Sequence, residues 1–164
     1  DMVAKELANQ PPSDVPKLQI KSSSGIVEFS VKHVSIDEKD PKANIVFLTD
    51  KKERIYLPLW IGRYEANEIR KVMNSELSVR PGVYQLFHNT LEALKVSVVK
   101  VIISELRGTT FIAQLVVNGG TELVMDSRAS DAICLAYWFE VPILVRDEVF
   151  NVAAYQDSTK ITEE

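Results

Sequence analysis

The sequence predicts an α+β fold, in which a mixed, largely antiparallel sheet packs with three to four helices in a single domain. Its 164 residues suit one domain, and 46% hydrophobic with 26% charged residues is an ordinary globular composition. Strand-like segments open the central part of the chain, two helix-like segments follow, and a second group of strand-like segments comes next. Strand groups separated by a pair of helices are typical of this class.

The first strand group has the alternation of a half-buried sheet. Residues 26–36 alternate between apolar and polar side chains, and the apolar runs 44–50 and 55–61 are separated by a charged turn. These segments predict an antiparallel meander. Pro58 lies inside the third run and indicates an edge strand or a bulge, because proline donates no backbone hydrogen bond.

Periodicity and turn residues predict the later elements. One helix is expected over residues 64–77, and its apolar stripe consists of Ala66, Ile69, Met73 and Leu77. The elements expected after it are a helix at 83–94, strands at 97–106, 109–118, 122–127 and 141–145, a buried helix at 130–139 and a short helix at 147–155. An Asn-Gly-Gly-Thr hairpin signal separates two of these strands.

Both ends of the chain are polar. Pro11, Pro12 and Pro16 lie among polar residues in the segment 1–22, which predicts an extended or disordered N-terminal arm that does not join the core. Residues 156–164 form a polar C-terminal tail in this interpretation. The predicted domain therefore covers residues 23–155.

Composition limits the possible classes of function. The formal net charge of -4 argues against a dedicated duplex-DNA-binding protein, which normally carries a basic stripe. The single cysteine, Cys134, excludes an intrachain disulfide and a cysteine-based zinc cluster. No apolar run reaches the roughly 18 residues of a membrane-spanning helix, so no membrane span is expected and the chain is predicted to be cytoplasmic.

The segment 125–139 changes from polar to apolar at Ala132. Helix capping is one explanation. Ser127 or Ser130 would cap the helix that follows, and Asp131 in its first turn would complement the helix dipole. Arg128 would then only pair with a neighbouring carboxylate.

A polar site at the end of the helix is the other explanation. Asp126 and Asp131 would face a cleft and hold Mg²⁺ or Mn²⁺, which prefer oxygen ligands, while Arg128 binds a phosphate oxygen. A metal at that place would stabilise charge on a phosphoryl group and activate a water molecule. The two explanations are compatible, because a helix N-terminus attracts anions.

Three blocks of the sequence carry a resemblance to a known family. They are LPLWIGRYEA at 57–66, VRPGVYQ at 79–85 and MDSRASDAI at 125–133. In order and spacing they are similar to the blocks of the bifunctional nuclease domain family, over roughly residues 24–152. The resemblance implies a compact α+β domain, often dimeric, in a family associated with hydrolysis of DNA and RNA.

The second and third blocks depart from the family pattern. Where the family has Leu-Thr-His-Asp after Arg-Pro, this chain has Gly82, Val83, Tyr84 and Gln85. A mechanism that needs this His-Asp pair therefore cannot operate here. Ala129 also replaces the proline of the third block.

Other polar and aromatic residues have both a structural and a functional explanation. Glu65 either complements a helix dipole or supplies a third carboxylate beside the same site. Arg80 is either a surface residue of a turn or a phosphate-binding residue, and its match to the Arg-Pro block supports the second role. A structural role is favoured for His88 over general-base catalysis. Packing is favoured over base stacking for Trp60 and Trp138.

These observations predict a metal-assisted nuclease-family domain that hydrolyses phosphodiester bonds of single-stranded DNA or RNA, and they predict a homo-oligomer, dimeric or larger. The predicted catalytic residues are Glu65, Asp126 and Asp131, the metal ligands are Asp126 and Asp131, and the substrate-binding residues are Arg80, Arg128 and Ser130. One alternative is a catalytically weak or inactive oligomeric module that binds or regulates. Another is a small-molecule hydrolase that uses the same carboxylates.

Overall fold

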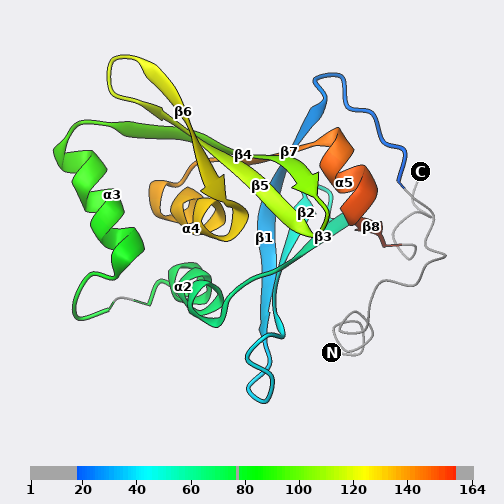
Figure 1. The fold of residues 1–164 in the computed structure, drawn as a ribbon, viewed down its shortest axis with the longest axis horizontal. Helices are drawn as coiled ribbons and strands as arrows, with labels where there is room; N and C mark the ends of the chain where they lie inside the picture. The colour runs from blue at the N-terminus through cyan, green and yellow to red at the C-terminus, as the bar shows by residue number, and fades with distance from the viewer. Residues whose placement is uncertain (1–17, 77, 158–164) are drawn as a thin grey trace.

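The computed structural model describes residues 18–76 and 78–157, in which groups of strands and helices follow one another along the chain (Figure 1). The strands are β1 (Ile26–Ile36), β2 (Asn44–Asp50), β3 (Ile55–Trp60), β4 (Ser97–Arg107), β5 (Thr110–Asn118), β6 (Glu122–Arg128), β7 (Ile143–Arg146) and β8 (Tyr155–Gln156). The helices are α2 (Arg63–Met73), α3 (Val83–Ala93), α4 (Ala129–Phe139) and α5 (Asp147–Ala153). Among the described residues, no helix is long and apolar enough to cross a membrane.

The strands form a single 8-stranded sheet in the order β6-β5-β4-β7-β1-β2-β3-β8. β7 pairs antiparallel with β1 and parallel with β4, and the other pairings of the described strands are antiparallel. β7 therefore joins the β1–β3 meander to the β4–β6 meander. The predicted single α+β domain with a mixed, largely antiparallel sheet is confirmed.

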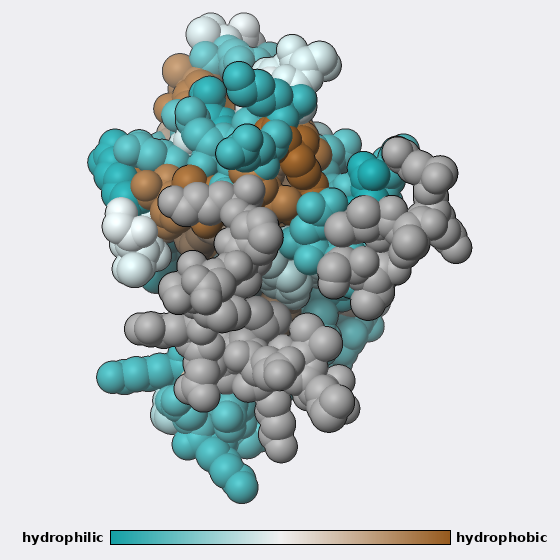
Figure 2. Space-filling view, turned by 90° about the vertical axis from the view of Figure 1, so that its right-hand side faces the viewer, coloured by the Kyte–Doolittle hydropathy of each residue, from teal (hydrophilic) through white to brown (hydrophobic). Residues whose placement is uncertain are grey.

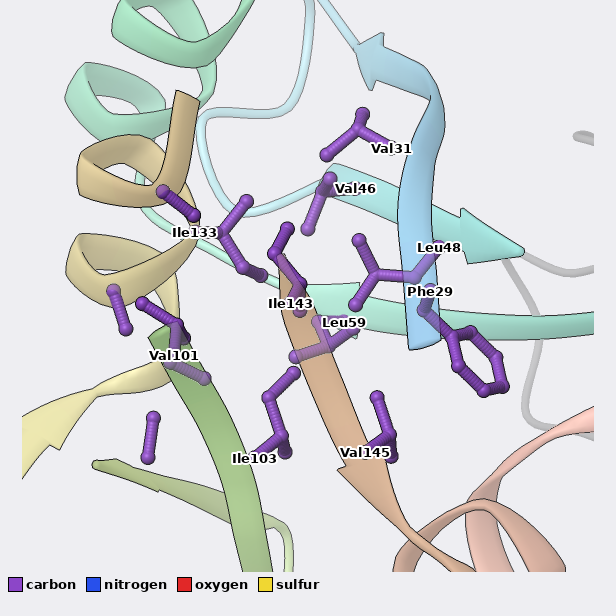
Figure 3. Close-up of a cluster of buried hydrophobic side chains, with 14 of the residues drawn as sticks. Phe29, Val31, Val46, Leu48, Leu59, Val101, Ile103, Ile133, Ile143 and Val145 are labelled. Carbon is purple, nitrogen blue, oxygen red and sulfur yellow. The ribbon is translucent and has the colours of Figure 1, made fainter. Parts of the chain in front are cut away.

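The core lies where α4 and α5 pack against the middle of the sheet. Figure 3 shows Val101 and Ile103 of β4 near Ile143 and Val145 of β7, with Ile133 of α4 in the same cluster. These side chains are at most 3% exposed. α4 also contacts α2 and α3, and Figure 1 shows these three helices grouped at one end of the molecule. This grouping brings the first turns of α2, α3 and α4 together.

The predicted element boundaries are correct for the first two strands and less accurate later. β1 and β2 have the predicted bounds, whereas α2 ends at Met73, four residues before the predicted end at position 77. Ser75 adopts a left-handed conformation with φ of 54°, which terminates the helix. Pro58 lies beyond the two β3 residues that pair with β8, in agreement with the predicted edge position.

Some predictions fall outside the described residues. These are Leu77 in the apolar stripe of the first helix, the segment 1–17 of the N-terminal arm and the segment 158–164 of the C-terminal tail. They stay predictions.

Residues 18–22 dock against α5, so the prediction that the whole segment 1–22 avoids the core is wrong for these residues. Leu18 is 8% exposed and belongs to the core cluster. The backbone nitrogen and the Oγ of Ser22 donate to the carboxylate of Asp147 at 2.7 and 2.9 Å. The polar composition concealed this contact, because the polar groups here bind the first turn of α5 instead of water.

Arg63, the first residue of α2, fixes the tip of the β1–β2 hairpin. Its Nε donates to Oδ1 of the fully buried Asn44 at 2.9 Å. Its Nη2 donates to the backbone carbonyl oxygens of Asp37 and Asp40. The hairpin tip projects at the bottom of the fold in Figure 1, and that end of the molecule is hydrophilic in Figure 2. These bonds set the position of the N-terminus of α2.

Candidate functional site

Polar side chains from the first turns of three helices meet in one group, here called the Arg128 cluster. Glu65 comes from α2, Tyr84 from α3, and Arg128 and Asp131 from the start of α4. Hydrogen bonds connect all four residues, with Arg128 in contact with both carboxylates. Two of the three family-like sequence blocks meet directly at Arg128, and the block at 79–85 joins them through Tyr84.

Arg128 is the centre of the cluster. Its Nε donates to Oδ2 of Asp131 at 2.7 Å and its Nη2 to Oδ1 at 2.9 Å, which is a bidentate arginine–carboxylate pair. The same Nη2 donates to Oε1 of Glu65 at 2.9 Å. No hydrogen bond to a described residue engages Nη1, and 67% of the side chain is exposed. The guanidinium is therefore fixed on one edge and open on the other.

Tyr84 closes the cluster from α3. Its hydroxyl donates to Oδ1 of Asp131 at 2.6 Å, and the residue is 6% exposed. Burial raises the pKa of Tyr84, and the hydrogen bond to Asp131 raises it further, so the hydroxyl keeps its proton at neutral pH. The ring also stacks on Tyr64 of α2 with 6.2 Å between the ring centroids. Tyr84 thus links α3 to both α2 and α4.

Arg128 and Asp131 form a true ion pair at neutral pH. Burial alone would raise the pKa of Asp131, but hydrogen bonds from Arg128 and Tyr84 stabilise the carboxylate, and the resulting pKa lies below the ordinary value. The hydrogen bond to Asp131, and then that to Glu65, raises the pKa of Arg128. The cluster therefore contains fixed charges of both signs.

Glycine at position 62 leaves room for the Glu65 carboxylate. Gly62 is the N-cap residue of α2, and Glu65 folds back over it from the first turn of the helix. A Cβ added at Gly62 would lie 2.1 Å from Oε2 of Glu65, so any side chain there would displace the carboxylate. The side chain of Glu65 is only 13% exposed. The glycine turn after β3 thus places this carboxylate against Arg128.

The predicted serine caps of α4 are wrong. The helix begins at Ala129 with Arg128 as its N-cap residue, and no side-chain hydrogen bond caps it. Ser127 is still in β6, where its Oγ donates to the carbonyl oxygen of Arg128 at 3.0 Å, and Ser130 is the second residue of the helix. Asp131 does lie in the first turn, as predicted. Serine capping therefore does not explain the polar segment.

Asp126 and the Arg128 cluster are separate, and the predicted metal ligands do not fit a metal in this arrangement. Asp126 lies within β6 opposite Gln114, where its charge acts on Arg107. Both oxygens of Asp131 already accept hydrogen bonds from Arg128. Among the described residues, no group of three or more His, Cys, Asp or Glu side chains is arranged to hold a metal ion. Metal dependence stays a prediction.

Arg80 and Ser130 lie near the cluster in sequence but form no bond with it. Arg80 is exposed in the segment between α2 and α3, and its side chain has no hydrogen bond or ion pair to a described residue. The Ser130 side chain is also without a hydrogen bond to the described part of the chain, and the residue is half-buried. Their predicted substrate-binding roles stay predictions.

The sequence-based site omitted Tyr84, although a signal for it was present. Tyr84 occupies the position where the family pattern has a histidine, and this position faces Asp131. His88, one helical turn further along α3, packs its ring against Phe139 with centroids 4.6 Å apart and lies 3.5 Å from Glu92. These contacts support the structural role that was favoured for His88.

The stability contributed by Asp131 is expected to depend on pH. Because its pKa is lower in the folded than in the unfolded state, its contribution is fully present above the ordinary carboxyl pKa of about 3.9 and is lost as the pH falls through the folded value. Urea unfolding of the wild type and Asp131→Asn should therefore differ at neutral pH and converge in acid. A difference between the two that stays constant down to the most acidic pH measured would contradict this expectation.

The part of the chain that contains the Arg128 cluster is similar in sequence to a protein family and to two further proteins. The family model described as the bifunctional nuclease domain matches residues 46–158, a range that contains the whole Arg128 cluster. The chain is also 30% identical over 124 residues to the uncharacterized proteins MT1877 and Rv1829 of two Mycobacterium tuberculosis strains. Each of these alignments covers 75% of this chain and 74% of the relative.

Proposed function

Because the chain belongs to the bifunctional nuclease domain family, we propose that it binds single-stranded DNA or RNA and hydrolyses its phosphodiester bonds. One observation carries the proposal. Glu65 and Asp131 hold the guanidinium of Arg128 by one edge, while its Nη1 edge is open. A guanidinium already fixed in place binds a phosphate oxygen with little further loss of side-chain freedom.

Exposed aromatic rings beside the cluster favour a single-stranded substrate. Tyr64, which stacks on Tyr84, is 50% exposed, and Trp60 at the end of β3 is also 50% exposed. Bases of a single strand stack on such rings, whereas bases of a duplex have no free faces. Sequence reasoning favoured packing for Trp60, and its exposure is the observation that supports a stacking role in this proposal. The net charge of -4 also fits a few local phosphate contacts better than a long duplex tract.

The proposed chemistry assigns different roles to the two carboxylates. Arg128 stabilises negative charge on the phosphoryl oxygens in the transition state. Glu65, whose Oε2 is not bound by Arg128, accepts a proton from the attacking water as the new P–O bond forms and the ester P–O bond breaks. The proton then passes to the leaving oxygen. Asp131 acts through Arg128, which it holds in place, and is a positioning residue.

A second cationic side chain lies close along the chain. Arg80 precedes Gly82 by two residues, and a Cβ built at Gly82 would lie 3.7 Å from the hydroxyl oxygen of Tyr64. The exposed guanidinium of Arg80 is thus carried by a segment that passes the stacked tyrosines. In the proposal it contacts a neighbouring phosphate of the strand, and Ser130 donates to the phosphate bound by Arg128.

Binding and cleavage of labelled oligonucleotides test this function. Single-stranded DNA, single-stranded RNA and a duplex of the same sequence are incubated with the protein in Mg²⁺, in Mn²⁺ and in EDTA, and products are resolved on a denaturing gel. The wild type should cleave a single strand, Glu65→Gln should bind but not cleave, and Asp131→Asn should bind more weakly. Absence of both binding and cleavage in every condition would overturn the proposal.

Binding without cleavage would favour the second candidate, an oligomeric binding or regulatory module. The observation behind it is the edge strand β6, which pairs with β5 on one side only. Its apolar residues Leu123, Val124 and Met125 are 58%, 57% and 38% exposed. An exposed apolar edge strand is an unfavourable surface for a monomer, because its unpaired backbone groups can form hydrogen bonds with a strand of a second chain. We propose that two copies cover this edge in a homo-oligomer.

Adding charge to this edge should dissociate the oligomer. Val124→Lys places an ammonium group among the exposed apolar residues of β6, where a second copy would have to bury it. Light scattering at micromolar concentration is expected to give more than the 18.5 kDa chain mass for the wild type and the chain mass for Val124→Lys. Val152→Lys, at a 65% exposed position on α5, is the matched control and should behave as the wild type. A monomeric wild type would remove the proposal.

A further inference from the structure

We propose that Arg128 takes the place of a divalent cation between Glu65 and Asp131, so that the wild-type site is closed to Mg²⁺ and Mn²⁺. The positive group that faces the substrate is then the chain's own guanidinium. The catalytic meaning of this inference rests on the proposed function. Metal binding itself can be measured on the protein alone, whatever the substrate.

Three of the four carboxylate oxygens of Glu65 and Asp131 already accept hydrogen bonds within the cluster. Oδ2 of Asp131 accepts a hydrogen bond from Nε of Arg128. Oδ1 of Asp131 accepts two hydrogen bonds, one from Nη2 of Arg128 and one from the hydroxyl of Tyr84. Oε1 of Glu65 accepts the same Nη2. Mg²⁺ binds carboxylate oxygens at about 2.0–2.1 Å in a strict octahedral geometry. The oxygens of Asp131 and Oε1 of Glu65 instead direct lone pairs at the N–H groups of Arg128. A metal could bind only after Arg128 has left.

The charges of the surroundings oppose a cation as long as Arg128 is present. The guanidinium compensates part of the charge of Glu65 and Asp131, and it would repel a dication placed beside it. The next carboxylate on α2, Glu68, is also neutralised, because it accepts a hydrogen bond from Lys71 at 2.8 Å. Arg128 and Lys71 thus offset two of the three carboxylate charges of Glu65, Asp131 and Glu68, which weakens the attraction of this region for Mg²⁺.

A second arginine of the chain shows that this pairing is specific. Arg146 is the N-cap residue of α5, and acidic residues follow it in the first turn, just as Asp131 follows Arg128 in α4. Yet the side chain of Arg146 forms no ion pair or hydrogen bond within the described residues. An arginine before an acidic helix start does not by itself bind a carboxylate. The pair at Arg128 instead depends on Glu65 from α2 and on the hydrogen bond from Tyr84.

Titration with Mn²⁺, followed by the electron paramagnetic resonance signal of the free ion, tests the inference. The wild type should show no saturable site at millimolar Mn²⁺. Arg128→Met, which removes the cation and keeps an unbranched side chain, should bind Mn²⁺ about tenfold or more tightly than the wild type. Arg128→Met with Asp131→Asn should lose the gain. Arg146→Met has the same net charge as Arg128→Met and should bind as the wild type does.

Three results would overturn the inference. The wild type could bind one Mn²⁺ as tightly as Arg128→Met, Arg146→Met could gain the same affinity, or Arg128→Met could fail to bind. If Arg128→Met does not fold, the wild-type titration decides alone, and a saturable wild-type site that Asp131→Asn abolishes overturns the inference. A protein that excludes Mn²⁺ but binds no oligonucleotide would refute the proposed function and leave this inference standing.

Discussion

Replacing Leu135 with alanine is expected to lower the free energy of unfolding by about 2–5 kcal/mol. Leu135 is 7% exposed on α4, the helix that contacts both the sheet and the neighbouring helices α2 and α3. Truncation there removes buried apolar contacts and leaves a cavity that a sheet on one side and helices on the other cannot easily close. Urea unfolding followed by circular dichroism measures the loss.

Leu86→Ala is the matched control for this substitution. Leu86 lies on α3, is 57% exposed, and loses the same atoms on truncation. Its substitution should lower stability by less than about 1 kcal/mol, because little burial is lost. Equal losses for Leu86 and Leu135 would show that the burial of α4 does not determine the stability of the fold.

Arg128→Lys should weaken binding of single-stranded DNA or RNA by about tenfold while leaving the melting temperature nearly unchanged. The ammonium group of lysine cannot form the bidentate pair with Asp131, reach Glu65 and still present a free edge to phosphate. Stability changes little, because ion pairs with an exposed partner contribute about 0–1 kcal/mol. Fluorescence anisotropy with a labelled oligonucleotide measures the affinity.

The side-chain charge is the same before and after this substitution. A loss of affinity would therefore come from the lost geometry of the guanidinium and not from a change in net charge. Arg146→Lys makes the same chemical change at an exposed arginine outside the Arg128 cluster. It should leave oligonucleotide affinity as in the wild type. Unchanged affinity in Arg128→Lys would mean that Arg128 contributes only to the α2–α4 contact.

Local patterns predicted those elements whose ends are marked by local chemistry. The bounds of β1 and β2 were predictable, because the alternation of β1 and the apolar run of β2 begin and end at charged or turn residues. β8 was not, since two residues form a strand only where the edge of β3 offers partners at Ile55 and Tyr56. The docking of residues 18–22 was equally hidden, because the hydrogen bonds of Ile20 and Ser22 go to α5, which lies far away in sequence.

The candidate site was predicted only in part, because local patterns reveal single residues but not contacts between residues far apart in sequence. Glu65, Arg128 and Asp131 were named from sequence, and pairing of Arg128 with a neighbouring carboxylate was one of the expectations. The contact between Arg128 and Glu65, however, joins residues 63 positions apart, which no local pattern reveals. Asp126 was included because it was expected to face a cleft at the start of α4, whereas β6 continues to Arg128 and keeps Asp126 opposite Gln114. Tyr84 was considered only as a departure from the family pattern, because its hydrogen bond to Asp131 joins residues that are 47 positions apart.

The position of β7 in the sheet has a consequence for the order of folding during synthesis. Each three-stranded meander, β1–β3 and β4–β6, has antiparallel neighbours close in sequence and can pair as soon as it leaves the ribosome. The strand that joins the meanders spans only Ile143–Arg146 and is synthesised after both. Until then, the edges of β1 and β4 that β7 will occupy stay unpaired and expose backbone groups to other chains. Chaperones that shield these two edges would act on the nascent chain before β7 is synthesised. Their role would end when the four residues of β7 insert between β1 and β4.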